Sequence, residues 1–534
     1  MPSKENPQGY VCLVLHAHLP FVRHPEYADC LEERWLFEAI TETYIPLIDV
    51  LQGLQRDGVD FRLTMSITPP LCSMLSDPLL QDRYLRGLEL LIELAELEVE
   101  RTRWMNDFRD TAVMYLRKFR RCREIFVDSC GGKILKAFRE LQDSGKLEII
   151  TCGATHGFMP LMQVNPQAVK AQISIATTHY QECFGRSAPG IWNGECGYFP
   201  GLEQYLAEEG LRYFFVDAHG ILYANNRPKY GVYAPVYCPN GMAAFGRDLE
   251  SSQAVWSAEQ GYPGDFRYRE FYRDIGYDLD FDYIKPYLHE SGLRVSTGIK
   301  YHKVTAAKVD LADKQPYGEA DALEAAAEHA GNFVFNRVQQ IDWLGGAMDR
   351  PPIVVCPYDA ELFGHWWYEG PEFLNYVFRK MHFDQQTVGL ITPTEYLERF
   401  PQNQVLTPTM SSWGVNGYNE VWLDESNDWI YRHLIKAAER MTELARQFSA
   451  PNELTRRALN QAVRELLLAQ SSDWAFIMKT RTMVDYACER TRRHLGNFTE
   501  LYQQLHQGQL DAEYLAGLEQ ANNIFPKLNY QVYA

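Results

Sequence analysis

The sequence lacks any run of apolar residues long enough to span a membrane, and its first residues lack the apolar stretch of a secretory signal. It is also poor in positive charge, because 52 Lys and Arg stand against 70 Asp and Glu, for a formal net charge of -18. Such a charge repels nucleic-acid phosphates and anionic lipids. We therefore expect a cytoplasmic protein that binds neither nucleic acid nor membrane, with a monomer favoured as its oligomeric state.

Paired cysteine motifs are missing as well. Eleven cysteines are scattered between Cys12 and Cys488 with no C-x-x-C pair, which matches neither a disulfide framework nor a zinc ribbon. We expect reduced and mostly buried thiols. Internal repeats and low-complexity tracts are also absent, so the 534 residues indicate a globular protein with one large domain and smaller additions.

What the sequence does contain is a series of short apolar runs separated by helical sequence. Several of these runs are apolar throughout, which is typical of parallel strands covered on both faces, as in α/β barrels and doubly wound folds. The runs are residues 10–15, 61–65, 147–151, 190–192, 213–216 and 353–356.

Three regions depart from this alternating pattern. Residues 77–142 carry apolar residues at helical spacing and predict a helical insertion. Residues 218–260 include turn-rich sequence and predict a lid loop. Strand patterns almost vanish from about residue 428, so we expect a catalytic domain over residues 1–400 and a helical C-terminal domain over residues 401–534.

Polar residues cluster directly after the apolar runs. His16 and His18 follow the first run, His156 follows the third, Glu195 follows the fourth and Asp359 follows the last. Because the carboxyl ends of barrel strands open into one shared mouth, we expect these five side chains to converge.

Glu195 and Asp359 together suggest a reaction, although either carboxylate alone is as easily structural. Glu195 lies between glycines and uncharged residues, and aromatic residues near Asp359 predict a carboxyl pKa raised by desolvation. In retaining glycoside chemistry, one carboxylate attacks the anomeric carbon while the other protonates the leaving oxygen and later activates the acceptor. That reaction needs the two carboxyl groups roughly 5 to 5.5 Å apart.

The histidines also permit other readings. Together with Asp359, the residues His16, His18 and His156 offer four groups that zinc accepts, as a zinc-dependent carbohydrate deacetylase or mannosidase would require. The same histidines are equally suited to donate hydrogen bonds to sugar hydroxyls, or to be satisfied within the core. A third alternative is a glucan-binding protein without catalysis.

Three tryptophans are candidates for stacking on sugar rings. Trp256, Trp413 and Trp422 each lie beside polar or loop residues rather than in an apolar stripe. Core packing is the competing interpretation for each of them, and it is favoured for Trp474 in the helical region.

Five ordered segments carry a resemblance that covers nearly the whole chain. They are residues 16–20, 154–160, 192–198, 358–367 and 412–414. With them the chain resembles glycoside hydrolase family 57. Within that family it looks most like the 1,4-α-glucan branching enzymes, which residues 255–257, 261–266 and 472–474 also resemble.

The resemblance implies an α/β fold, a distorted (β/α)7 barrel with a helical insertion and an all-helical C-terminal domain that completes a glucan cleft. It implies an α-glucan substrate, with no metal and no cofactor. Carried across by position, Glu195 is the nucleophile and Asp359 the general acid/base. The implied substrate-binding residues are His16, His18, His156, Tyr230, Trp256, Trp413, Trp422 and Asp473.

Two positions bear on which activity to expect. Tyr230 matches the tyrosine at the tip of a mobile loop that favours transfer over hydrolysis in the family's branching enzymes. Gly194 replaces the proline that usually precedes the nucleophile, so we expect altered rate or precision rather than lost activity. The nearest rival activities on this scaffold are those of an α-amylase and a 4-α-glucanotransferase.

Overall fold

A sheet of nine strands lies at the centre of the molecule. The computed structural model describes residues 7–257, 259–289 and 291–534. Within these ranges the strands are β1 (Gly9–Ala17), β2 (Leu63–Ile67), β3 (Leu147–Cys152), β4 (Gly190–Trp192), β5 (Tyr213–Val216), β6 (Val236–Tyr237), β7 (Ala243–Gly246), β8 (Ile353–Asp359) and β9 (Val388–Leu390). All six apolar runs of the sequence form strands, as predicted.

The strand order makes the sheet a distorted barrel. Seven strands run parallel in the order β7-β5-β4-β3-β2-β1-β8, with β6 antiparallel to β7 and β9 parallel to β1. The Asp248 amide, just after β7, donates a 2.9 Å hydrogen bond to the Val355 carbonyl of β8 and links the two ends of the order. The predicted α/β fold with a distorted (β/α)7 barrel is confirmed.

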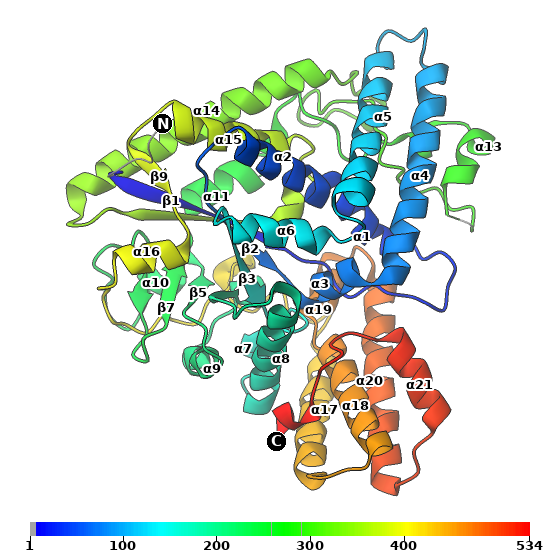
Figure 1. The fold of residues 1–534 in the computed structure, drawn as a ribbon, viewed down its shortest axis with the longest axis vertical. Helices are drawn as coiled ribbons and strands as arrows, with labels where there is room; N and C mark the ends of the chain where they lie inside the picture. Colours follow the sequence, from blue (N-terminus) through cyan, green and yellow to red (C-terminus); the bar gives the residue numbers. More distant parts are fainter. Residues whose placement is uncertain (1–6, 258, 290) are drawn as a thin grey trace.

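Helices cover the outer face of the barrel strands. In Figure 1, α14 packs against β1 and α8 packs against β3. β1 is buried along its whole length because its other face lines the barrel interior, where Tyr10, Cys12 and Val14 pack with residues of β4, β5 and β7. The helices of the barrel are α1 (Glu33–Ala39), α2 (Ile45–Arg56), α3 (Pro69–Ser76), α7 (Met159–Met162), α8 (Pro166–Phe184), α9 (Leu202–Glu208), α10 (Ala218–Leu222), α11 (Leu249–Trp256), α12 (Ile275–Asp278), α13 (Phe281–Ile284), α14 (Glu319–Ala347), α15 (Gly370–Phe383) and α16 (Pro393–Arg399).

The predicted helical insertion is also present. It consists of α4 (Pro78–Arg101), α5 (Arg109–Arg123) and α6 (Ile134–Asp143), and Figure 1 shows α4 and α5 as a long pair that extends away from the barrel. Asp77 begins α4 by accepting hydrogen bonds from the Leu79 and Leu80 amides, which otherwise lack a partner at a helix start.

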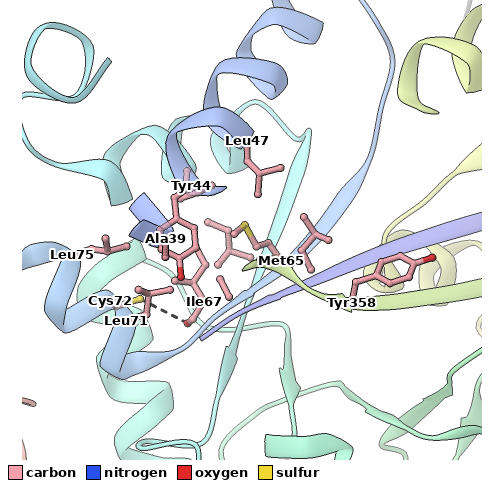
Figure 2. Packing of buried hydrophobic residues seen from close by; sticks show 14 of the residues in the cluster. Ala39, Tyr44, Leu47, Met65, Ile67, Leu71, Cys72, Leu75 and Tyr358 are labelled. Atoms are coloured by element: carbon pink, nitrogen blue, oxygen red, sulfur yellow. Dashed lines mark hydrogen bonds between the residues drawn. The ribbon is translucent and has the colours of Figure 1, made fainter. Parts of the chain in front are cut away.

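A hydrophobic core fixes α3 beside the strand ends. Figure 2 shows Met65 and Ile67 of β2 packed with Leu71 and Cys72 of α3, and all four side chains are buried. Pro69 begins α3 directly after β2, where a proline costs no helical hydrogen bond. The position of α3 is therefore tied to that of the strands.

The expectation of a lid loop over residues 218–260 is wrong. That range contains α10, α11 and two strands, and β7 is a fully buried strand of the barrel. The sequence shows no clear strand pattern here because β7 is only four residues long and includes two alanines and a glycine, which have weak strand preference. Irregular backbone is confined mainly to residues 223–235.

The C-terminal helices form a separate group beside the barrel, at the lower right of Figure 1. The segment before them still belongs to the barrel surface, because Ser411 bridges to Tyr198 and Val405 bridges to Tyr237. The limit at residue 400 therefore stays a prediction. The helices are α17 (Trp429–Gln447), α18 (Glu453–Ala469), α19 (Ser472–Thr480), α20 (Val484–Gln507) and α21 (Ala512–Ala521).

Two expectations drawn from absences can be compared with the structure. In the described part of the chain, no helix combines the length and apolar character that crossing a membrane requires. All eleven cysteines are free thiols, and only Cys183 and Cys488 are not fully buried.

Candidate active site

Four of the predicted site residues lie at the carboxyl ends of neighbouring barrel strands. His16 near the end of β1 pairs in register with Asp359 at the end of β8. His156 follows β3 and Glu195 follows β4. Because carboxyl ends of parallel strands share one edge of a barrel, the fold itself brings these side chains to one place.

Glu195 lies in a strained turn. Its backbone has φ 62° and ψ 25°, and Cys196 follows with φ 52°, so two consecutive residues other than glycine occupy the left-handed region. The Trp413 amide donates to the Glu195 carbonyl at 3.0 Å, and the Cys196 amide donates to the Asn193 carbonyl at 2.8 Å. These bonds hold the turn in the conformation that points Glu195 at its partners.

The Glu195 carboxylate is held by side chains from distant parts of the chain. Trp413 Nε1 donates to Glu195 Oε2 at 2.9 Å, and the Ser472 hydroxyl donates to Oε1 at 3.1 Å. His156 Nδ1 lies 3.8 Å from the same Oε1 atom. Burial raises the Glu195 pKa to about 7, and although the Trp413 hydrogen bond opposes this, the charges of Asp473 and Asp359 add to it.

Asp359 has a more open setting. Its side chain is exposed, and it makes no hydrogen bond or ion pair with any residue in the described ranges. Protein atoms nevertheless surround it on most sides at the base of the site, and this desolvation raises its pKa to about 6. The positive charges of His18 and Arg247 act in the opposite direction.

Three histidines form a stacked row beside the two carboxylates. The Nε2 atoms of His16 and His156 are 2.9 Å apart, which requires one of them to donate and the other to accept. The rings of His18 and His156 stack with centroids 3.8 Å apart, and His16 stacks on Trp192 at 5.1 Å. Burial lowers the pKa of His16 and His156 well below the ordinary value, so both are neutral near pH 7.

His18 differs because it forms an ion pair. Its Nε2 atom lies 3.0 and 2.9 Å from the two oxygens of Asp473, at the start of α19, and its Nδ1 atom lies 3.0 Å from the Thr68 hydroxyl. Burial alone would lower the His18 pKa, but Asp473 raises it overall. Burial likewise acts to raise the Asp473 pKa, yet His18 lowers it to about 2. The C-terminal helices thus supply a fixed negative charge to the site.

Two protein families match different parts of the chain, one the barrel and the other the C-terminal helices. Residues 12–409 match the family described as glycosyl hydrolase family 57. The chain belongs to glycosyl hydrolase family 57. Residues 433–533 match the C-terminal region described for 1,4-alpha-glucan branching enzymes. The first match contains Glu195 and Asp359, and the second contains Ser472 and Asp473.

Individual family 57 relatives match the chain over nearly its full length. A 1,4-alpha-glucan branching enzyme from Thermococcus kodakarensis is 32% identical over 97% of this chain and 77% of its own. Its crystal structure, with glucose and additives, has a TM-score of 0.89 and 31% identity and covers 99% of this chain and 96% of that one. A probable 1,4-alpha-glucan branching enzyme from Mycobacterium tuberculosis is 30% identical over 98% of this chain and 97% of its own.

A family 57 crystal structure with a different name is also similar. The alpha-amylase AmyC from Thermotoga maritima has a TM-score of 0.93 and 48% identity, and the match covers 98% of this chain and 99% of that one. Relatives that share this fold therefore carry two activity names, and the overall likeness does not choose between them.

The three tryptophans predicted to stack on sugar have different positions in this family 57 chain. Trp413 contacts Glu195 directly, as described above. Trp256 ends α11 with 56% of its side chain exposed. Trp422 is 1% exposed and stacks on Phe158 with centroids 4.3 Å apart, so its ring has no free face. The expectation that Trp422 stacks on a glucan is corrected to core packing.

Tyr230 lies far from the other predicted residues. Its hydroxyl donates to Asp349, and Lys229 forms a 2.7 Å ion pair with the same carboxylate. Asp349 precedes β8, whereas Asp359 ends it, and a strand of seven residues spans about 20 Å. The Lys229 amide also donates to Gln404 at 2.7 Å. These contacts hold Tyr230 at the opposite end of the barrel from Asp359, and its expected role in substrate binding stays a prediction.

Gly194 occupies a crowded position. A Cβ atom there would lie 3.2 Å from both the His156 and the Gly157 carbonyl oxygens, closer than most side chains accept. The left-handed strain of the turn falls on Glu195 and not on Gly194. The small residue therefore allows the Glu195 turn to approach the His156 backbone closely, and its effect on rate stays a prediction.

Sequence reasoning missed several residues that contact the site. Ser472 lies beside the predicted Asp473, and the Ser-Ser-Asp start of α19 was a visible signal for a helix N-terminus. Glu361 accepts hydrogen bonds from the His18 amide at 3.2 Å and the Tyr44 hydroxyl at 2.5 Å, and burial raises its pKa to about 7. Arg247 follows β7, the strand that the sequence did not reveal, so it gave no signal.

The zinc alternative named four residues that the structure does not assemble into one ligand set. Among the residues with described positions, the possible metal-holding groups are His16 with Cys152 and His156, and His18 with His156 and Asp473. Asp359 belongs to neither group. The 2.9 Å contact between His16 and His156 also uses the Nε2 atoms of both rings for each other.

Proposed function

We propose that this protein is a 1,4-α-glucan branching enzyme that acts by retaining double displacement. The observation that carries the proposal is the origin of Ser472 and Asp473. Both belong to the region that matches the branching-enzyme C-terminal family, and both contact the groups of the barrel, Ser472 at Glu195 and Asp473 at His18. The branching-enzyme relatives, matched along nearly the whole chain, support the same assignment.

In the first step, Glu195 attacks C1 of an internal α-1,4-linked glucose while Asp359 protonates the departing glycosidic oxygen. The bond between C1 and that oxygen breaks as the bond between C1 and a Glu195 oxygen forms. Two donors fix the Glu195 carboxylate, as a nucleophile that must meet one carbon atom requires. Asp359 is exposed and free of such partners, which suits a group that gives and takes protons.

In the second step, Asp359 removes the proton from the 6-OH of an acceptor glucan. The acceptor oxygen then displaces Glu195 from C1 and leaves an α-1,6 branch with the original anomeric configuration. The product is a glycogen-like or starch-like polymer. The His18–Asp473 ion pair places a cation between acidic groups and keeps that face of the site polar for sugar hydroxyls.

A second candidate, α-amylase activity, has specific support. AmyC of Thermotoga maritima, an α-amylase, is 48% identical over 98% of this chain. Tyr230, whose expected counterpart favours transfer, is held away from the site by Asp349. In an α-amylase, water would take the place of the acceptor 6-OH in the second step, with the same two carboxylates.

Incubation with amylose separates these functions. Branching produces new α-1,6 anomeric proton signals in NMR spectra without a matching rise in reducing ends. An α-amylase produces reducing ends at the rate of bond cleavage and no α-1,6 signal. A 4-α-glucanotransferase lengthens and shortens linear chains with neither change. The last two results contradict the proposal.

A further inference from the structure

A cleft outside the active site lies between the barrel and the C-terminal helices. One wall is the segment after β1, with Arg23, Pro25 and Glu26, and the other is formed by α20, α21 and the residue that follows α21. Arg490 and Arg493 of α20 belong to the second wall. The cleft has a volume of about 400 Å³, which falls within the range of small-molecule sites. Three arginines from two parts of the chain therefore line a space that a small ligand can enter.

Two of these arginines have carboxylate partners. Arg23 Nε lies 2.8 Å from an Asp77 oxygen, and Arg493 forms ion pairs with Glu26 at 3.0 Å and with Glu489 at 2.5 Å. The positive charges of Arg23 and Arg493 are thus balanced within the protein. The Glu26 carboxylate, which also lines the cleft, is already engaged by Arg493.

Arg490 differs, because it forms no ion pair with a carboxylate among the described residues. It is only 3% exposed, and its Nη2 atom donates to the Phe21 carbonyl at 3.3 Å. Its Nε atom is buried and has no hydrogen-bond partner in the part of the chain that the structure describes. The Trp474 ring lies 6.0 Å away, at the limit of a cation–π contact. Buried charges are costly unless they are paired, so Arg490 gives the cleft a positive charge that the chain does not balance.

The neighbouring His24 is affected by this unbalanced charge. Burial and the positive charge of Arg490 lower the His24 pKa to about 4, although Glu26 acts to raise it. His24 is therefore neutral near pH 7, and its Nε2 atom lies 2.8 Å from the Tyr486 hydroxyl. The charge that this region offers to an anion comes from the arginines, and the nearby Glu26 does not cancel it.

We propose that this cleft binds the phosphate group of a small molecule and that the bound phosphate ties the C-terminal helices to the barrel. Arginine suits this role because its planar guanidinium group presents paired N–H donors that match two phosphate oxygens. Arg490 and Arg493 come from α20 and Arg23 from the segment after β1, so a phosphate between them bridges both parts of the chain. Inorganic phosphate and a sugar phosphate share this chemistry, and the volume of the cleft accommodates either one.

Thermal unfolding of the full-length protein tests binding without reference to activity. At about 10 mM, inorganic phosphate or glucose 6-phosphate should raise Tm by about 2 °C or more above its value in NaCl of equal ionic strength. A larger shift with glucose 6-phosphate assigns the cleft to a phosphate monoester, and a shift as large with inorganic phosphate assigns it to the free ion. Glucose alone tests for binding through the sugar. A Tm that neither phosphate compound raises, or that glucose raises as much as glucose 6-phosphate does, overturns the proposal.

Substitutions on α20 test whether Arg490 supplies the binding charge. Arg490→Met removes the unpaired charge but keeps the length of the side chain, and the affinity for phosphate in calorimetric titrations should fall by about 10- to 100-fold. Arg493→Gln, at a more exposed position, should also weaken binding and decides the question if Arg490→Met does not fold. Arg492→Met is the matched control, because Arg492 is an exposed arginine on the same helix that lies over Trp429 and not in the cleft. Equal losses in all three variants would mean that phosphate responds to the overall charge of α20, which contradicts the proposal.

Hydrogen exchange measured by mass spectrometry tests the location of the site and the bridge between the two parts of the chain. With phosphate at about ten times its Kd, amide exchange should slow by up to about tenfold both in residues 19–29 and in α20. Exchange in α5, which lies in the helical insertion and does not line the cleft, should stay unchanged. Slower exchange on one side of the cleft alone contradicts the bridge. Slower exchange only around the Glu195 turn would place phosphate in the active site and overturn the proposal.

Discussion

The turn that carries Glu195 and the strand end that carries Asp359 serve one site but are built differently. Glu195 has a left-handed backbone, and Trp413 and Ser472 hold its carboxylate. Asp359 has an ordinary extended backbone at the end of β8 and an exposed side chain. The first region fixes a direction, whereas the second leaves a carboxyl group open to an arriving oxygen. This difference underlies the assignment of attack to Glu195 and of proton transfer to Asp359.

The pKa values of the free enzyme run against those roles. Glu195 at about 7 holds its proton more tightly than Asp359 at about 6, although the nucleophile must be ionised and the acid protonated. A bound glucan would remove solvent mainly from Asp359, because Glu195 is already enclosed. Substrate binding is thus expected to raise the Asp359 pKa and reverse the order.

The largest expected effect comes from replacing Glu195, the carboxylate that Trp413 and Ser472 hold in place. Glu195→Gln keeps the shape of the side chain but cannot form the glycosyl intermediate, so we expect the rate on amylose to fall by at least about 10,000-fold. Initial rates of iodine-stain loss measure this, and thermal unfolding serves as the control for an intact fold. A loss below 100-fold would mean that another group attacks C1.

Replacing Asp359, the exposed carboxylate, should lower the rate less than replacing Glu195 does, and the loss should depend on the leaving group of the donor. Asp359→Asn should lower the rate on amylose by about 100- to 10,000-fold, the range for general acid–base groups. With a maltosyl fluoride donor, whose leaving group needs no protonation, the variant should form the intermediate at close to the wild-type rate. Added azide should then accept the sugar. An equal loss of rate with amylose and with maltosyl fluoride would contradict the assignment of Asp359 as the general acid/base.

The sequence predicted the region of Asp359 and Glu195 better than it predicted the surroundings. Strand runs and the polar residues after them are local patterns, so a covered parallel sheet and the positions of both carboxylates at strand ends follow from them, whereas the (β/α)7 barrel was implied by the family resemblance. The contacts that hold Glu195 come from Trp413 and Ser472, 218 and 277 residues away in the chain, and no local pattern encodes such distances.

The differences between expectation and structure have the same origin. Trp422 was assigned from its polar neighbours in sequence and from the family resemblance, and Tyr230 from the resemblance alone, yet Phe158 covers one and Asp349 holds the other. Both partners are remote in the chain. Strand β7 escaped detection because two alanines and a glycine carry too little propensity to reveal a strand that tertiary packing alone stabilises.

A smaller effect is expected from removing one hydrogen bond to the Glu195 carboxylate while Glu195 itself is kept. Trp413→Phe deletes the Nε1 donor but keeps an aromatic ring against Trp192, and hydrogen bonds to charged groups contribute about 1.5–3 kcal/mol. We expect kcat to fall by about 10- to 100-fold. Because this bond lowers the Glu195 pKa, its loss should raise that pKa and move the acidic limb of the pH–rate profile to higher pH.

Trp422→Phe is the matched control for that variant, since Trp422 is buried against Phe158 and its indole nitrogen has no hydrogen-bond partner among the described residues. It should leave the acidic limb in place even where it lowers stability. If both variants move the limb equally, the Trp413 bond is not what sets the ionisation of Glu195.

The smallest expected effect is a displacement of the alkaline limb between two pH profiles. The kcat/KM profile reports the free enzyme, in which Asp359 is exposed, whereas the kcat profile reports the complex with substrate. Since loss of the Asp359 proton ends the first step, activity falls as pH rises through its pKa. Enclosure by glucan raises that pKa, so the alkaline limb of kcat should lie about one pH unit above that of kcat/KM. Alkaline limbs at the same pH in both profiles would mean that bound substrate does not raise the pKa of Asp359. Enclosure of Asp359 would then not reverse the pKa order of the two carboxyl groups.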